Sequence, residues 1–337
     1  MKAYELQKTG SIEGWVQVDR PDPKPGPGQA LVRIRAVSLN YRDWVIARGS
    51  YRRGLPDLPL IPVSDGAGEV VAVGEGVTRV KPGDRVAPTF FQTWTDGPQT
   101  PERTARALGG NIDGVLAQHV VLDAEGLVHL PDYLSFEEGS TLPCAAVTVW
   151  NTLVLEGKLQ AGQTVLAQGT GGVSIFALQF ARMLGARIII TSSHDEKLER
   201  ARQLGANETL NYKKHPDWEQ KVLELTGGQG VDHIIEVGGE QTLPKSLRAA
   251  RPGGHIHLIG LLSGAPGKPD AAQGDSKQVQ LHPVYVGSRV MFEDMNRAMT
   301  PHRLKPVIDR VFPFDQAREA LRYMQEGAHF GKVVISV

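Results

Sequence analysis

Apolar and polar residues change their spacing about halfway along the chain. Before about residue 130 they alternate in short runs that end in glycine or proline turns, as in 30–37 and 68–74. Alternation over four to eight residues is typical of half-buried strands. Many short strands with frequent turns predict a small barrel for this part of the chain.

From Thr164 to about Gly260 the spacing indicates strands that alternate with helices. The strands are predicted at Thr164–Gln168, Arg187–Thr191, Glu208–Leu210, Asp232–Val237 and His255–Gly260. The helices after the first one are predicted at Asp195–Leu204, Asp217–Thr226 and Leu243–Ala250. Such alternation predicts an α/β fold with a doubly wound parallel sheet.

Further elements are predicted outside this alternating region. Ser135 and Glu138 have the spacing of a capping box that begins a helix, which Pro143 would interrupt. The remaining predictions are a loop at 90–111, a loop at Gly264–Gln278, a sixth strand at Pro283–Gly287, helices near Phe292–Met299 and Asp315–Glu326, and a last strand at Lys332–Val337.

A glycine-rich turn lies between the first strand and the first helix of the alternating region. Gly169, Thr170, Gly171, Gly172 and Val173 form this turn. A strand, a glycine turn and a helix start together bind a dinucleotide pyrophosphate, because the backbone can approach the phosphates and the helix amides face them. Serine stands where the third glycine of the motif is expected, and it is small enough to let helix and strand approach. The alternative is an ordinary turn with glycines for packing.

Length and composition set further limits. The 337 residues allow two domains and a large core, and the formal net charge of zero gives no indication of nucleic acid or an anionic membrane as a partner. One cysteine, Cys144, permits no internal disulfide. The N-terminus lacks the apolar core of a signal peptide, and no apolar run is long enough to span a bilayer. We therefore expect a cytoplasmic protein.

Several segments, in this order and spacing, resemble the medium-chain dehydrogenase/reductase superfamily. Besides the glycine turn they are 25–32 (PGPGQALV), 65–71 (DGAGEVV), 80–86 (VKPGDRV), 142–148 (LPCAAVT) and 330–334 (FGKVV). The resemblance implies a GroES-like catalytic domain from residues 1–144 and 288–337 and a Rossmann NADP-binding domain from 145–287. It also implies an active site in the cleft between the domains, and frequent homodimers.

The superfamily includes zinc enzymes, which hold the catalytic metal with cysteine, histidine and a third ligand. Here the first two positions resemble Asn40 and Ser64, and only Cys144 falls on a ligand position. One thiol and the carboxylate of Asp65 do not build a tetrahedral zinc site. The loop at 90–111 also lacks the four cysteines of a structural zinc lobe. We therefore expect no zinc, and we expect His255 and His257 to line the core or the cleft.

Asn40 and Asp43 instead resemble the zinc-free quinone-oxidoreductase branch, which includes zeta-crystallin. The resemblance implies that both contribute to substrate or nicotinamide binding and that Thr148 lies beside the nicotinamide. The alternatives are a turn cap for Asn40, a structural salt bridge for Asp43, and a hydroxyl bonded within its own helix for Thr148.

The end of the second Rossmann strand predicts which nicotinamide cofactor binds. Ser192 stands where an NAD-binding protein has an acid, so a 2′-phosphate meets no repulsion, and Lys197 adds a positive charge. Tyr212 resembles a family tyrosine beside the cofactor phosphates. Ser193 is a further candidate, although it could simply cap the helix. We favour NADPH over NADH, and complete the cofactor site with Val237, Ile259 and Gly260.

Together these features predict a zinc-independent NADPH-dependent oxidoreductase that passes hydride to a quinone, an enone or a related carbonyl substrate. One alternative is a zinc-free alcohol or aldehyde dehydrogenase. Another is a non-catalytic NADPH-binding protein with a redox-responsive or structural role. The substrate pocket is expected to draw on Trp44, Phe90, Phe91, Trp94, Tyr285 and Phe292.

Overall fold

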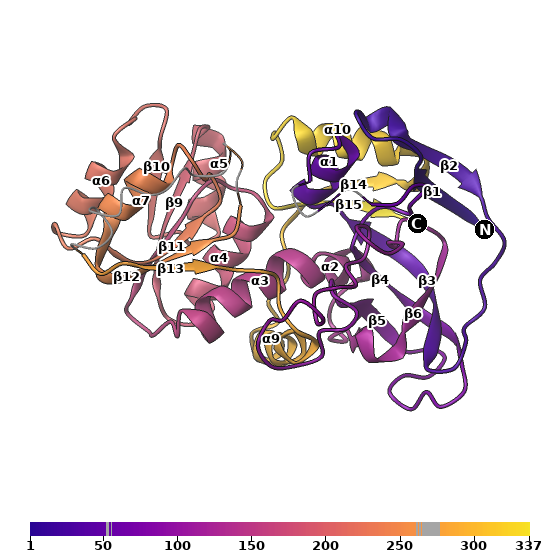
Figure 1. Ribbon diagram of the computed structural model, residues 1–337. Helices are drawn as coiled ribbons and strands as arrows, with labels where there is room; N and C mark the ends of the chain where they lie inside the picture. Colours follow the sequence, from indigo (N-terminus) through magenta and orange to yellow (C-terminus); the bar gives the residue numbers. More distant parts are fainter. Residues whose placement is uncertain (52–53, 55, 261, 263, 265–276) are drawn as a thin grey trace. The chain divides into compact units, whose positions relative to one another are not determined.

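The computed structural model describes residues 1–51, 54, 56–260, 262, 264 and 277–337 (Figure 1). The chain divides into two compact units, Met1–Val147 with Val286–Val337, and Thr148–Tyr285. We call the first the GroES-like unit and the second the Rossmann unit. The divisions fall close to the predicted boundaries at 144 and 287.

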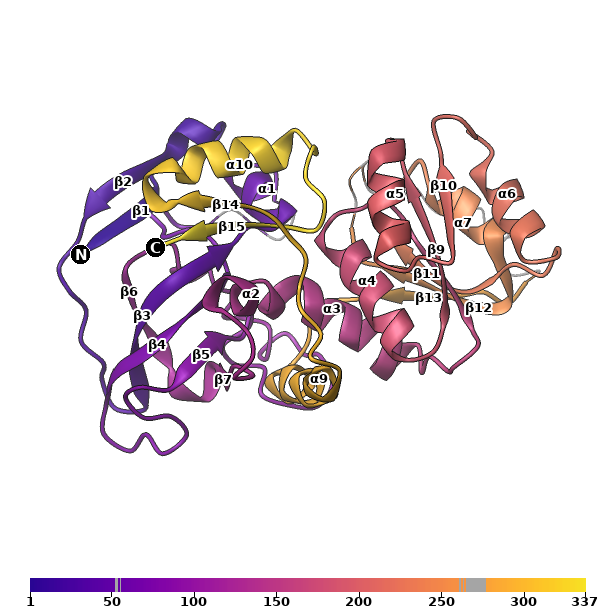
Figure 2. The same cartoon turned by 180° about the vertical axis from the view of Figure 1, so that it is seen from behind.

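The GroES-like unit is built on a seven-stranded sheet in the order β14-β15-β3-β4-β5-β7, with β6 paired to β3. Its strands are β3 (Gln29–Ser38), β4 (Asp65–Val73), β5 (Arg85–Pro88), β6 (His119–Asp123), β7 (Leu127–His129), β14 (Ile308–Pro313) and β15 (Lys332–Ser336). The two segments of this unit, Met1–Val147 and Val286–Val337, therefore meet in one sheet, since β15 pairs antiparallel with β3 (Figures 1 and 2). The sequence analysis did not locate β6, β7 or β14, nor the separate antiparallel pair β1 (Lys2–Leu6) and β2 (Trp15–Asp19).

The alternation predicted at 30–37 is confirmed along β3. Val32, Ile34 and Ala36 are buried, whereas Arg33 is exposed and Arg35 is partly exposed. Val32 and Ile34 belong to one apolar core that continues through the neighbouring strands and helix α10 (Ala317–Gln325).

A long helical segment follows Ser135. The capping box is confirmed: Ser135 Oγ accepts from Glu138 N at 3.1 Å, and Glu138 Oε2 accepts from Ser135 N at 2.8 Å. The predicted interruption at Pro143 is a change of helix type. After α2 (Phe136–Ser140) the chain continues as a π-helix (Leu142–Ala146), α3 (Val147–Trp150) and a second π-helix (Asn151–Glu156). Proline is tolerated because it lies in the first turn, where its missing N–H is not needed.

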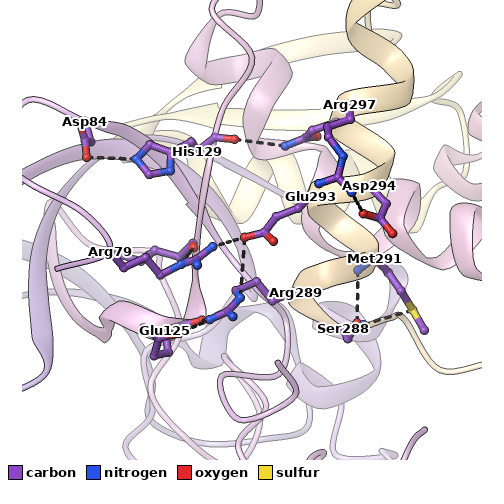
Figure 3. A network of polar contacts seen from close by, with 12 residues as sticks. Arg79, Asp84, Glu125, His129, Ser288, Arg289, Met291, Glu293, Asp294 and Arg297 are labelled. Atoms are coloured by element: carbon purple, nitrogen blue, oxygen red, sulfur yellow. Dashed lines mark hydrogen bonds and ion pairs between the residues drawn. The ribbon is translucent and has the colours of Figure 1, made fainter. Parts of the chain in front are cut away.

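Helix α9 (Arg289–His302) is longer at both ends than predicted and is attached to the edge of the sheet by a polar network (Figure 3). Arg289 pairs with Glu125, and Arg79 pairs with Glu293. Asn296 Nδ2 donates to the backbone oxygen of His129 on β7 at 3.2 Å. These contacts cover the exposed edge of β7.

The Rossmann unit contains a six-stranded parallel sheet in the order β10-β9-β8-β11-β12-β13. Its strands are β8 (Thr164–Ala167), β9 (Arg187–Ser192), β10 (Glu208–Asn211), β11 (Val231–Glu236), β12 (Ala250–Leu258) and β13 (Gln280–Pro283). Its helices between strands are α4 (Gly172–Met183), α5 (Asp195–Gln203), α6 (Trp218–Leu225) and α7 (Leu243–Ala249). The doubly wound parallel sheet is confirmed. None of the helices in the described ranges is long and apolar enough to cross a membrane.

The sixth strand was predicted at the wrong residues. Pro283 ends β13 instead of beginning a strand at 283–287. The sequence pattern was misleading because the apolar residues after Pro283 follow the strand. Most of the predicted loop at Gly264–Gln278 lies outside the described residues.

Four histidines, which we call the histidine row, lie on one face of the last three strands. His257 is fully buried and His255 is partly exposed, so His257 belongs to the core. His233 Nδ1 lies 3.4 Å from His257 Nε2, and His255 Nδ1 lies 2.9 Å from His282 Nε2. Each contact fits an N–H···N hydrogen bond between two neutral rings.

Candidate active site and cofactor site

The glycine turn has the shape that a pyrophosphate site requires. Gly169 has a φ of +74°, a region that favours glycine. A Cβ atom on Gly169 or Gly171 would meet no atom within 4 Å, so there is open space where an anion would approach. Ser174 is buried, and its hydroxyl donates to the backbone oxygen of Gln168 at 2.6 Å. Serine therefore also closes the turn in place of the third glycine.

The other predicted cofactor residues lie at the same edge of the sheet, because carboxyl ends of parallel strands share one edge. Ser192 ends β9, and the amide of Tyr212, just after β10, donates to the Ser192 oxygen at 3.1 Å. Val237 follows β11 directly. Ile259 and Gly260 follow β12 in the same way, and Lys197 lies in the first turn of α5.

The alternative role of Ser193 as a helix cap is wrong. Helix α5 begins after His194, one residue later than the capping box assumed. Ser193 Oγ instead contacts His194 Nδ1 at 2.8 Å. Ser192 Oγ accepts from His194 N at 3.4 Å. The local backbone therefore leaves Ser192 at the strand end, where a 2′-phosphate reader is expected.

Glu236 is a positioning residue that the sequence analysis missed. This carboxylate is fully buried at the end of β11, and both of its oxygens accept hydrogen bonds. The donors are Gly238 N (2.9 Å), Gly239 N (3.0 Å), Thr242 Oγ1 (2.5 Å), Gln168 Nε2 (2.8 Å) and Ser246 Oγ (2.5 Å). Glu236 thereby connects the residue before the glycine turn to the loop after β11. The available signal was an acid at the end of a buried strand, one residue before two glycines.

In the GroES-like unit, Asn40 and Asp43 form part of a buried polar cluster. Asn40 precedes α1 (Tyr41–Ala47), and Asp43 Oδ2 accepts from the Asn40 backbone N–H at 2.8 Å. Asp43 thus holds the start of this helix. Asp65, at the start of β4, accepts from Ser64 Oγ at 2.7 Å and from the backbone N–H of Cys144 at 3.0 Å.

Lys332 completes this cluster and was missed as a site residue, although it lies within the FGKVV segment. Its ammonium donates to Leu39 O at 2.7 Å and to Asn40 Oδ1 at 2.6 Å. Only 3% of Lys332 is exposed. Because an ammonium is a donor only, the amide oxygen of Asn40 must face it and Nδ2 must point away. We call Asn40, Asp43, Asp65, Cys144 and Lys332 the buried polar cluster.

Burial raises the pKa of the acidic groups in this cluster and so favours their protonated forms. Burial raises the pKa of Asp43 to about 6, against the opposing effects of Arg42 and the Asn40 N–H. Burial also raises the pKa of Asp65, and the charge of Lys332 is the strongest opposing effect. The pKa of the Cys144 thiol is raised by burial and by Asp65. Cys144 therefore stays a thiol at neutral pH, and a thiolate is the form that binds metals.

The residues at the family's metal-ligand positions do not fit zinc. The Asn40 oxygen accepts from an ammonium, and both oxygens of Asp65 accept hydrogen bonds within the protein. The Lys332 charge beside them would repel a divalent cation. Within the described residues, no group of three or more His, Cys, Asp or Glu side chains is arranged to hold a metal ion.

Thr148 and the aromatic residues predicted to line the substrate pocket contact residues outside the buried polar cluster. Thr148 belongs to the Rossmann unit, is buried, and accepts at its backbone oxygen from Thr152 Oγ1 at 2.7 Å. In the loop at 90–111, Phe90 and Phe91 are buried with ring centroids 4.7 Å apart, and Trp94 packs against Phe91. This loop is therefore held by its own aromatic core.

The open space at the glycine turn gives a first testable expectation. Gly171→Val should weaken binding of a dinucleotide cofactor by roughly 10–100-fold, the range for overpacking a closely fitted site. The φ of −77° at Gly171 suits valine, so the fold should survive. Titration of cofactor fluorescence, with thermal unfolding as the folding control, measures this. Gly171→Ala should lose less, and native affinity in the valine variant would contradict the assignment of the turn.

Comparison with known proteins matches both units. The family described as "Alcohol dehydrogenase GroES-like domain" matches residues 26–132, and "Zinc-binding dehydrogenase" matches residues 172–301. A zinc-type alcohol dehydrogenase-like protein of Schizosaccharomyces pombe is 47% identical over 93% of this chain and 92% of its own. A quinone oxidoreductase of Pseudomonas aeruginosa is 37% identical over 78% of this chain and 74% of its own. A solved structure of a putative alcohol dehydrogenase from Sinorhizobium meliloti has a TM-score of 0.93, 41% identity, and coverage of 100% of this chain and 98% of its own.

Proposed function

The chain belongs to the medium-chain dehydrogenase/reductase superfamily of oxidoreductases, and we propose that it is a zinc-independent, NADPH-dependent member that reduces a quinone, an enone or a related carbonyl compound. One observation carries this proposal. Where zinc members hold the catalytic metal, this chain has an amide bonded to a buried ammonium. Hydrogen-bond donors without a Lewis acid suit activated acceptors better than simple alcohols.

NADPH would supply the hydride when bound. In this proposal the glycine turn and the first amides of α4 hold its pyrophosphate. Ser192 and Lys197 bind the 2′-phosphate, and Tyr212 lies beside the cofactor phosphates. Val237, Ile259 and Gly260 line the remaining cofactor surface. Glu236 keeps the turn in place through its hydrogen bond with Gln168.

Asn40 is the proposed donor to the oxygen that becomes negative during reduction. Asp43 positions Asn40 through the backbone hydrogen bond at the helix start. The proposal retains Thr148 as a contact of the nicotinamide. It also includes a cytoplasmic homodimer, for which β13 offers an unpaired edge in the described sheet.

The function is tested by following NADPH and NADH oxidation with 1,4-benzoquinone, a simple enone and an aldehyde, with metal analysis of the same sample. We expect turnover of quinone or enone with NADPH, no stoichiometric zinc, and no effect of a chelator. About one zinc per chain, lost together with activity, would contradict the proposal. Cofactor binding without turnover of any acceptor would instead favour a non-catalytic binding protein.

A zinc-free alcohol dehydrogenase is the second candidate. The names of the S. pombe and S. meliloti relatives support alcohol dehydrogenase activity, although the S. pombe relative is named a zinc-type protein. The same assay separates the two candidates. Alcohol oxidation faster than enone or quinone reduction, in metal-free protein, would favour the dehydrogenase.

Cofactor preference has its own test in Lys197. Lys197→Ala should weaken NADPH binding by roughly 1–3 kcal/mol, the range for a charged hydrogen-bond partner, and leave NADH nearly unchanged. Lys221→Ala is the matched control, since this lysine lies on α6 and pairs with Glu224. Equal losses for the two cofactors would show that Lys197 does not bind the 2′-phosphate.

A further inference from the structure

Lys332 is a buried cation near Asp65 and Asp43 whose hydrogen bonds go to neutral groups. Among the described residues it forms no ion pair within 4.0 Å, and its two hydrogen bonds go to neutral oxygens, Leu39 O and Asn40 Oδ1. An ammonium that is 97% shielded from water costs several kcal/mol unless its charge is compensated. Its charge acts on Asp65, Cys144 and Asp43, so the compensation comes from the whole buried polar cluster.

The Asn40 side chain accepts from Lys332 at Oδ1 and still has N–H groups on Nδ2 that can donate. Asn40 Nδ2 is buried and forms no hydrogen bond of good geometry with any described residue, although it favours the ionised form of Asp65. A buried N–H without a partner costs about 1–3 kcal/mol. A ligand oxygen or a water molecule would satisfy it. The nearby positive charge favours an oxygen that is negative.

We propose that Lys332 is a positioning residue that turns the Asn40 amide into a binding site for an anionic oxygen, of the enolate or phenolate class. By donating to Oδ1, the ammonium fixes which end of the amide accepts and leaves Nδ2 as the donor. It also draws electron density toward Oδ1, which makes the N–H groups on Nδ2 stronger donors. The ammonium supplies the positive charge that zinc supplies in other members. This inference rests on the proposed function for its biological role, but the anion site is testable without turnover.

The probe is 4-nitrophenol, whose neutral and ionised forms have different absorption spectra. It is titrated with the full-length protein, with and without NADP⁺, across pH. We expect the wild-type protein to prefer the ionised form by about tenfold, which is one pKa unit of the bound phenol. Lys332→Met should remove this preference, and Lys332→Arg should restore part of it. A merely structural lysine would change stability without changing the phenol titration.

Two further variants serve as controls for effects on folding. Lys332→Met with Asp65→Asn removes one charge of each sign, which should recover stability if the single variant unfolds, yet should still lack the preference for phenolate. Lys305→Met is the matched control, because this lysine is exposed and pairs with Glu138 on the same unit. It should behave as the wild type does.

The outcomes separate this inference from the proposed function. A preference for phenolate that depends on Lys332 supports the inference even if no acceptor is turned over. An unchanged preference in a folded Lys332→Met protein overturns the inference. A wild-type protein that binds both forms of the phenol equally also overturns it, and Asn40 Nδ2 would then bind only water. If the enone is reduced, kcat should fall in Lys332→Met by roughly tenfold or more while NADPH affinity stays constant.

Discussion

Asn40→Ala should lower kcat/KM for 1,4-benzoquinone or a simple enone by about 10²–10³-fold, as loss of one oxyanion donor does in other enzymes. The reason is local. Asn40 Nδ2 forms no hydrogen bond of good geometry within the described residues, and Oδ1 accepts from Lys332 at 2.6 Å. Removing the amide therefore removes a prepared donor and leaves the ammonium with one acceptor fewer.

The measurement is steady-state kinetics, with NADPH affinity followed separately by fluorescence. NADPH binding should change far less than kcat/KM, because the glycine turn lies in the other unit. Asp43→Asn is the informative companion variant. An amide oxygen can still accept from the Asn40 backbone N–H, so this variant should lose less activity. Unchanged turnover in Asn40→Ala would remove Asn40 from the mechanism, and loss of cofactor binding alone would assign it to the nicotinamide.

The regions with regular spacing were predictable because local pattern determines them. Strands β8 and β9, the turn between β8 and α4, and the capping box at Ser135 all depend on residues close together in the chain. The family resemblance also singled out Asn40 and Asp43, and the structure joins them through a hydrogen bond at the start of α1. Their catalytic role stays a prediction.

Contacts between distant segments were not predictable from spacing. Lys332 reaches Asn40 across 292 residues, and only the pairing of β15 with β3 brings them together. Glu236 reaches Gln168 across 68 residues for the same kind of reason. Both are buried charged groups that finish or begin a strand. An acid or a lysine at the boundary of an apolar strand is therefore the signal to look for.

Elements whose apolar residues show no regular spacing were also missed or misplaced. Helix α1 has seven residues, too few to show helical spacing, and no element was predicted there. The π-helices around Pro143 widen the turn by one residue, which shifts the apolar spacing. Strand β13 has mostly exposed side chains, so it carries no apolar signature.

Acid should destabilise the Rossmann unit in the window between about pH 6.5 and 4. Burial, with the charge of His255, lowers the pKa of His233 from 6.5 to about 4, and burial also lowers the pKa of His257. Between these values the unfolded chain binds a proton that the folded chain does not, so the free energy of unfolding falls as the pH falls. His233 alone should account for roughly 3 kcal/mol of this loss at pH 4.

The groups around the histidine row do little to offset the lowered pKa of His233. Each N–H···N contact needs one neutral acceptor nitrogen, so a proton on both rings of a pair breaks the bond. His233 Nε2 faces the neutral Gln163 side chain at 3.1 Å. Glu156 lies 3.9 Å from His282, while Asp232 only partly opposes the lowered pKa of His233.

Amide hydrogen exchange of β11 and β12 as a function of pH measures the effect within this unit, with the strands of the GroES-like unit as internal reference. His233→Gln keeps a polar side chain but removes the titrating group, so its exchange should vary less between pH 6.5 and 4. His215→Gln is the matched control, because His215 is exposed in the same unit. If the wild type and His233→Gln lose protection in parallel as the pH falls, another group causes the acid sensitivity, and the histidine row is only a set of packed rings.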